Sequence, residues 1–237
     1  DKLETLAGMF GIGQLPTGDR DPYALRRQAL GVIRILIERD LPLQLDTLIS
    51  SAFAVFDSKL NLAQAQTDVQ IFFFERKRGY FADAGYTAQE IDAVLSMHPV
   101  AVNKIPLQLA AVRAFSALPE AASLAAANKR VANILRQAET KGEAGRDADA
   151  KLLQEPAERA LFEALQKASG TATPLFKKGD YTGYLKTFAM LKTPVDAFFD
   201  NVMVMAEDAA LRRNRIALLE DLRREMNQIA DISKLAT

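Results

Sequence analysis

The chain has 237 residues, of which 49% are hydrophobic and 25% are charged, a balance typical of folded domains rather than disordered segments. It contains no Cys, which excludes disulfides and thiolate metal sites. Its 30 basic residues balance 30 acidic ones, so tight non-specific nucleic-acid binding is disfavoured, although a local basic patch remains open. Because no apolar run approaches the roughly 20 residues that span a bilayer, we expect a cytoplasmic protein without membrane association.

The first half of the chain is predicted to be almost entirely helical. It starts at Asp1, inside a helix and without an initiator Met, which indicates a fragment of a longer polypeptide. A loop rich in Gly and Pro follows, after which Asp21 and Pro22 are suited to an N-cap and a first helical residue. Thr87 and Glu90 form a capping-box pattern further on. The helices expected before Pro119 cover residues 23–40, 46–56, 67–84, 87–98 and 105–118.

Pro119 marks the predicted boundary between two domains, residues 1–118 and residues 119–237. No alternating strand pattern and no repeat at a fixed period is present. The sequence therefore predicts an all-α fold with two helical domains. In the second domain we expect helices over residues 120–139 and 155–169, a helix capped by Asp180, and helices over residues 195–205 and 209–232, with loops at 141–150 and 170–179.

Two features that resemble catalytic motifs lack the partners that catalysis needs. The Gly-x-Gly at residues 11–13 has neither a preceding strand nor a third glycine that opens a helix, which favours a structural loop over a nucleotide site. His98 is the only histidine, and no nucleophile or paired carboxylates accompany it. An interaction with a helix C-terminus is therefore favoured over a role as a base. We expect no catalytic residue, no metal site and no bound cofactor in this chain.

Two stretches mix basic side chains with groups that can contact nucleic acid. Three consecutive Phe precede Arg76, Lys77 and Arg78, a combination that suits either domain packing, which is favoured, or RNA contact. Residues 125–136 place amide and basic side chains beside an apolar stripe, which suits a single-stranded RNA loop as well as an ordinary amphipathic helix. The candidates in this second stretch are Asn128, Lys129, Arg130, Asn133 and Arg136.

A third basic stretch opens the last predicted helix. It contains Arg212, Arg213, Asn214 and Arg215, and follows a nearly uncharged apolar helix. A helical hairpin with a basic corner can hold a polyanion without burying charge. Asp208 and Glu207 are alternative ion-pair partners for Arg215, so Arg212 and Arg213 are the candidates retained for RNA.

Residues 1–27 and 198–219 resemble the β subunit of bacterial glycyl-tRNA synthetase. The second of these stretches, and the helix at 125–135, are similar to the helical, DALR-type anticodon-binding domain that this family shares with arginyl-tRNA synthetase. The resemblance implies such a helical bundle over residues 119–237. It also implies that residues 1–118 end a body region similar to HD-type phosphohydrolase folds, in which Asp1 resembles a last metal ligand whose companions are absent.

The resemblance implies a non-catalytic, tRNA-binding part of a glycine–tRNA ligase. In the family, a small α subunit carries the aminoacylation site, and two α and two β chains form a heterotetramer that uses ATP and Mg²⁺. The expected partners are glycine tRNA and the α subunit, and not DNA. The alternative is a structural module that docks the catalytic subunit. The expected RNA-binding residues are Asn128, Lys129, Arg130, Asn133, Arg136, Arg212 and Arg213.

Overall fold

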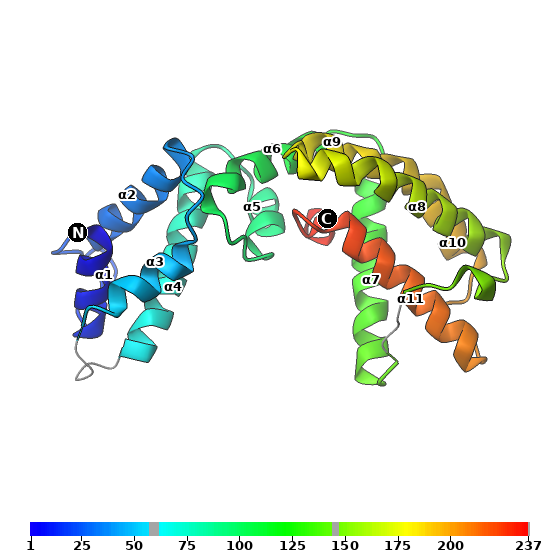
Figure 1. Ribbon diagram of the computed structural model, residues 1–237, viewed down its shortest axis with the longest axis horizontal. Coiled ribbons are helices and arrows are strands. Elements are labelled where there is room, and N and C mark those ends of the chain that lie inside the picture. Colours follow the sequence, from blue (N-terminus) through cyan, green and yellow to red (C-terminus); the bar gives the residue numbers. More distant parts are fainter. Residues whose placement is uncertain (57–61, 144–146, 237) are drawn as a thin grey trace. The chain divides into compact units, whose positions relative to one another are not determined.

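The computed structural model describes residues 1–56, 62–143 and 147–236, so part of the expected 141–150 loop lies outside the described residues. Every regular element in the described residues is a helix, which confirms the all-α fold (Figure 1). None of these helices alone is long and apolar enough to cross a membrane. Residues 102–116 and 121–140, which are bent at the break between them, together have the length and apolar composition of a membrane span. The chain divides into two compact units.

The first unit comprises residues 1–91 and 98–106. Helix α1 packs against the three helices that follow it, and α4 also contacts α2 and α3. Leu6, Ile33, Ile49 and Phe73 lie fully buried between them. The helices are α1 (Lys2–Gly11), α2 (Leu25–Glu38), α3 (Leu45–Phe53), α4 (Leu62–Asp83), the start of α5 (Ala88–Leu95) and the 3₁₀ turn η1 (Val102–Lys104).

The start of α2 differs from the prediction. Asp21 does cap the helix, because its carboxylate accepts hydrogen bonds from the amides of Leu25 (2.8 Å) and Arg26 (3.0 Å). However, Pro22 and Tyr23 remain outside the helix, because Ala24 has a left-handed backbone with a φ of 52°. The capping box of Thr87 and Glu90 forms as predicted, with both reciprocal hydrogen bonds present.

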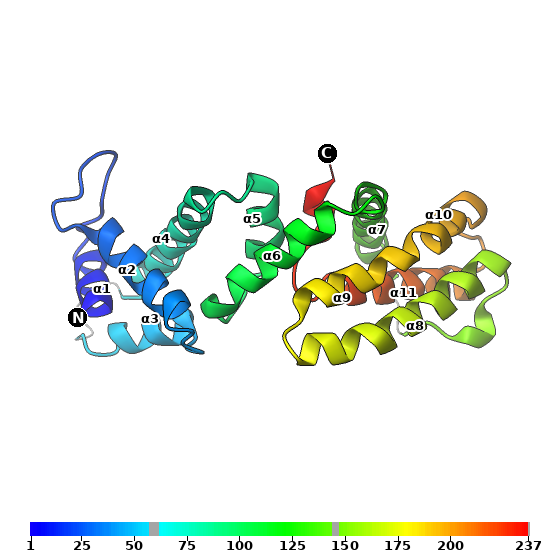
Figure 2. The ribbon, with the colours of Figure 1, turned by 90° about the horizontal axis from the view of Figure 1, so that it is seen from above.

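The second unit comprises residues 92–97 and 107–237, and it therefore begins before Pro119. The domain boundary expected at Pro119 stays a prediction. Helices α8, α10 and α11 run alongside one another (Figure 2), and α7 packs against α10 and α11. The buried core includes Leu161, Phe188, Phe198 and Leu218. The α-helices are α6 (Ile105–Ser116, mostly in this unit), α7 (Ala121–Thr140), α8 (Pro156–Lys177), α9 (Tyr181–Thr187), α10 (Lys192–Asn201) and α11 (Ala209–Met226). The 3₁₀ turns are η2 (Ala150–Leu152), η3 (Phe188–Leu191) and η4 (Ile232–Leu235).

The loop predicted at 170–179 is wrong, because α8 continues through Gly170 to Lys177. Ala168 and Ala172 both lie fully buried on its inner face, so the tertiary packing of α8 outweighs the low helix propensity of Gly170. Pro174 lies inside the helix. The chain turns only at Gly179, whose positive φ of 76° suits a residue without a side chain.

Helices α10 and α11 end at least four residues earlier than predicted. Helix α10 stops at Asn201 and not at residue 205, and α11 stops at Met226 and not at residue 232. The buried side chain of Asn227 accounts for the second end. It donates to the carbonyl of Arg223 (2.7 Å) and accepts from the amide of Ile232 (2.8 Å), so it stabilises a bend between α11 and η4.

Alanine substitutions at two glycines, Gly170 and Gly183, test whether α8 extends through Gly170. Gly170 is exposed, and a Cβ added there meets open space. We therefore expect Gly170→Ala to raise the free energy of unfolding by about 0.5–1 kcal/mol. At Gly183 a Cβ would lie 2.4 Å from the carboxylate of Asp180 that caps α9. Loss of this cap, at about 1 kcal/mol, should cancel the same gain in Gly183→Ala.

Denaturant unfolding of the two variants beside the parent chain measures both effects. Equal stabilisation at the two glycines, or destabilisation by Gly170→Ala, would contradict the described geometry.

Candidate nucleic-acid interface

The basic start of α11 lies one turn after its N-cap. Asp208 accepts hydrogen bonds from the amides of Ala210 (2.8 Å) and Leu211 (2.9 Å). These two donors hold the pKa of the Asp208 carboxyl below its usual range, so the charged cap persists to lower pH than an ordinary aspartate would. Because consecutive helical residues point about 100° apart, the run 212–215 cannot present all of its side chains on one surface.

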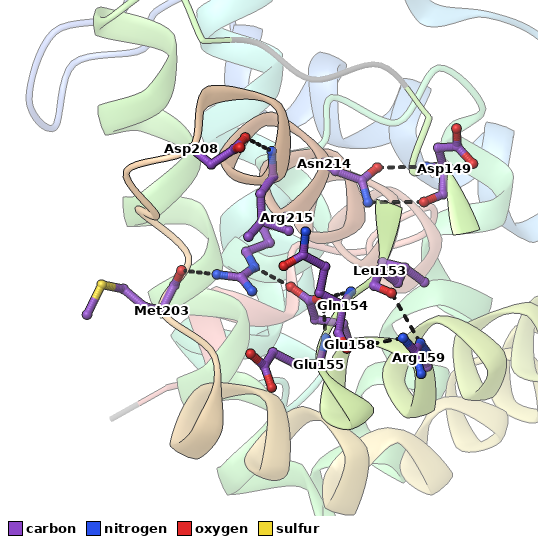
Figure 3. Close-up of polar contacts among 11 residues, drawn as sticks. Asp149, Leu153, Gln154, Glu155, Glu158, Arg159, Met203, Asp208, Asn214 and Arg215 are labelled. Carbon is purple, nitrogen blue, oxygen red and sulfur yellow. Dashed lines mark hydrogen bonds and ion pairs between the residues drawn. The ribbon is translucent and has the colours of Figure 1, made fainter. Parts of the chain in front are cut away.

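Arg215 points into the interior and pairs there with Glu158 at the start of α8 (Figure 3). The two side chains are 6% and 0% exposed. The guanidinium donates from Nε to Glu158 and from Nη1 to the carbonyl of Met203 (2.7 Å). The other carboxylate oxygen accepts from the amides of Gln154 (2.6 Å) and Glu155 (2.9 Å). The prediction that Arg215 pairs with Asp208 or Glu207 was therefore wrong.

Two neighbours of Arg215 hold loops of the second unit. Arg212 forms a salt bridge of 2.8 Å with Glu143 and donates to the carbonyls of Ala206 (2.6 Å) and Glu207 (3.1 Å). Asn214 is buried and bonds both ways with the backbone of Asp149, at 2.8 and 3.1 Å. An RNA contact by Arg212 would have to break these bonds.

Asn128, the first predicted contact on α7, faces the core. It is only 2% exposed, and its amide oxygen accepts from Nδ2 of Asn227 at 2.9 Å. Its own Nδ2 lies 3.8 Å from the sulfur of Met226. The side chain thus joins α7 to the end of α11. This burial argues against base contact by Asn128, and we draw the candidate surface without it.

The remaining candidates on α7 are exposed. Lys129, Asn133 and Arg136 follow one another at helical spacing and share one face. Arg136 donates to the Asn133 side chain at 3.2 Å, which brings a cation and an amide together. Arg130 does not lie on this face, and its guanidinium lies over the ring of Phe199 on α10. Arg213 on α11 is also exposed, with Nε donating to the carbonyl of Ala209 at 3.1 Å.

The alternative basic patch on α4 belongs to the first unit and is half-buried. The guanidinium of Arg76 lies 5.5 Å from the ring centroid of Phe72. The ammonium of Lys77 lies 5.9 Å from the ring of Phe74, in a cavity of about 400 Å³. Burial lowers the pKa of Lys77. Desolvated cations of this kind are less available to phosphates than the exposed side chains of α7.

The other motifs occupy local structural positions. The Gly-x-Gly ends α1, where Gly13 has a positive φ of 75°. The ring of His98 lies against that of Phe74, with their centroids 6.1 Å apart. Asp1 is exposed at the start of α1. In the parts of the chain that the structure describes, no three His, Asp or Glu side chains are grouped closely enough to hold a metal ion.

Glu158 and Phe199 were not among the residues selected from the sequence. Glu155 and Glu158 are spaced as a capping box, a pattern that marks the start of α8, and both of its hydrogen bonds form. That local pattern gives no sign of Arg215, which lies 57 residues further along the chain. Phe199 has an apolar side chain, and nothing in the local sequence indicates that a cation lies over its ring.

Loss of the buried ion pair between Glu158 and Arg215 should lower the stability of the fold. Glu158→Gln would leave the Arg215 charge buried without a carboxylate, so we expect the free energy of unfolding to fall by about 3 kcal/mol. The exposed control Glu163→Gln should change it by less than about 0.5 kcal/mol. Removing both charges, with Glu158→Gln and Arg215→Met together, should recover part of the loss. Denaturant titration measures all three, and an equal response to Glu158→Gln and Glu163→Gln would refute this role.

Comparisons with known proteins match both units. A family model described as glycyl-tRNA synthetase beta subunit matches residues 1–96, and one described as DALR anticodon binding domain matches residues 124–235. The second match spans α7 to η4 and includes every exposed candidate on α7 and α11.

Whole-chain relatives agree with these matches. The chain is 59% identical over 236 residues to the glycine–tRNA ligase beta subunit of Thiobacillus denitrificans, 56% to that of Dechloromonas aromatica and 55% to that of Acidovorax sp.. Each alignment covers 100% of this chain but only 32–33% of the relative. The chain thus spans about one third of the length of these relatives, and it belongs to the glycyl-tRNA synthetase beta subunit family.

Proposed function

We propose that the second unit binds the anticodon region of glycine tRNA as part of a glycine–tRNA ligase. The observation that carries this proposal is the exposed face of α7, where Lys129, Asn133 and Arg136 lie together inside the DALR-matched segment. The chain as a whole has no net charge. A local cationic face therefore supports recognition of one RNA segment better than general attraction to polyanions.

The side chains on this face divide the work of recognition. Lys129 and Arg136 can neutralise phosphates, which fixes position but carries no sequence information. Asn133 offers one amide donor pair and one acceptor, which suit the edge of an unpaired base. A glycine anticodon contains two cytosines, whose amino and carbonyl groups complement such an amide. Arg213 is a further exposed cation for the backbone.

The ligase chemistry belongs in this proposal to a separate α subunit. The relatives are named as beta subunits, which supports a partner chain in the enzyme. We propose a heterotetramer of two α and two β chains in the cytoplasm, with ATP and Mg²⁺ used at the α-subunit site. This chain would bind neither cofactor and would contribute tRNA recognition.

Docking of the catalytic subunit is the second candidate function. Ile71 and Val100 in the first unit are each 57% exposed and line the cavity beside Lys77. Exposed apolar side chains of this kind suit a protein partner. The two functions are compatible, because the apolar side chains lie in the first unit and the basic face lies in the second.

The basic face predicts distinct effects of charge and amide substitutions. Lys129→Ala and Arg136→Ala should each weaken tRNA binding and lower the salt slope by roughly 0.7–0.9 for each phosphate that is no longer neutralised. Asn133→Ala should reduce discrimination between glycine and other anticodons and leave the slope nearly unchanged. Lys178→Ala and Lys186→Ala, at exposed positions on other elements, are the matched controls. Filter binding across a salt series with glycine and non-glycine tRNAs measures these effects.

If folded variants of all three α7 residues keep the affinity and anticodon preference of the parent chain, this face does not bind the RNA. Arg76–Arg78 would then be the candidate RNA surface.

The division of labour predicts that the 237-residue chain alone does not catalyse glycine-dependent ATP–pyrophosphate exchange. The reaction should appear only when the α subunit is supplied. Exchange above background by the purified chain, abolished by substitutions within it, would overturn the assignment of catalysis to the partner.

A further inference from the structure

Arg130 and Phe199 form a cation–π pair between α7 and α10. The guanidinium carbon lies over the ring, 4.2 Å from its centroid. Phe199 is half-buried and meets the fully buried Phe198 edge-on, with centroids 5.5 Å apart and an interplanar angle of 79°. The ring is thus anchored to the core on one side and covered by a cation on another.

Within the residues that the structure describes, the charge of Arg130 has no acidic partner. Its cation–π contact with Phe199 is the one interaction that the described residues give it. Asp196, the acid one turn before Phe199 on α10, is already occupied by Lys192 (2.8 Å) and Ser123 (3.1 Å). Arg130 is exposed, so its guanidinium presents a flat cation to solvent.

The segment after Phe199 is held in place by the arginines of α11. Arg215 donates to the carbonyl of Met203, and Arg212 donates to the carbonyl of Ala206. These anchors fix the backbone between α10 and α11, so Phe199 is carried on a pre-organised support. Binding to such a surface loses less conformational entropy than binding to a mobile one.

We propose that Arg130 and Phe199 form a stacking platform for one unpaired nucleobase of the bound RNA. Guanidinium planes and aromatic rings are the groups on which proteins stack splayed-out bases, and here a guanidinium already lies over an aromatic ring. The base stacks on the solvent side of Arg130, whose charge also favours the nearby phosphates. The inference rests on the proposed function and assigns the base-stacking contact to a residue pair outside the Lys129–Asn133–Arg136 face.

The test uses the 237-residue chain and glycine tRNA carrying 2-aminopurine at each unpaired position of the anticodon loop in turn. Stacking quenches 2-aminopurine fluorescence, so the parent chain should quench one position strongly on binding. Phe199→Leu keeps an apolar side chain but removes the ring, and Arg130→Lys keeps the charge but removes the plane. Each should weaken binding by about 5- to 150-fold, the range expected for one stacked base.

Both variants should lose the quenching while keeping the salt slope, because neither changes the net charge. Phe199→Tyr retains a ring and should restore binding and quenching. The matched control is Phe176→Leu, which alters another half-buried aromatic, packed against Tyr181 and Tyr184 on a different part of the unit. Circular dichroism verifies folding, and Arg130→Lys provides a surface change should Phe199→Leu fail to fold.

The outcomes separate the two proposals. Unaltered affinity and quenching in Arg130→Lys and Phe199→Leu, while Lys129→Ala and Arg136→Ala still weaken binding, would overturn the platform and leave the proposed function standing. Absence of tRNA binding by the folded parent chain would overturn both.

Discussion

The buried ion pair between Arg215 and Glu158 is the constraint on which the second unit depends. Two charges removed from water are tolerated only when every charged atom has a partner. The protein meets this requirement by bringing together the first turn of α8, the middle of α11 and the carbonyl of Met203. Each of these segments is thereby fixed with respect to the other two. The segment that continues from α10 is tied to the pair through the carbonyl of Met203, while α10 itself packs against α8 and α7.

This constraint decides which basic residues remain available for RNA. A run of three arginines and an asparagine suggests a nucleic-acid surface, yet Arg212 and Arg215 are engaged by carboxylates and carbonyls, and Asn214 is buried against Asp149. Most of the charge at the start of α11 thus stabilises loops. Of the candidate cations, Lys129, Arg130 and Arg136 on α7 and Arg213 on α11 remain exposed, and helical spacing places Lys129 and Arg136 on a face that the core does not use. Arg212 and Arg215 instead hold the backbone that follows Phe199, through the carbonyls of Ala206 and Met203.

Local signals in the sequence predicted much of the fold. The Asp180 cap and the Thr87–Glu90 box were predicted because a cap and the amides it satisfies lie within a few residues. The extension of α8 through Gly170 was missed, because packing at Ala168 and Ala172 overrides local propensity. The contacts of the candidate site residues were predicted less accurately, because they too depend on tertiary packing. The partners of Arg215 and Asn128 lie 57 and 99 residues away, and no local pattern connects them.

Arginine modification with phenylglyoxal, followed by mass spectrometry with and without glycine tRNA, distinguishes the arginines that are engaged within the fold from those that contact RNA. It reports on each guanidinium separately and requires no substitution. We expect Arg130 and Arg136 to react in the free chain and to become protected by tRNA, while Arg215 and Arg212 stay poorly reactive in both states. Strong reaction of Arg212 and Arg215 in the free chain, with protection by tRNA and none at Arg136, would contradict it.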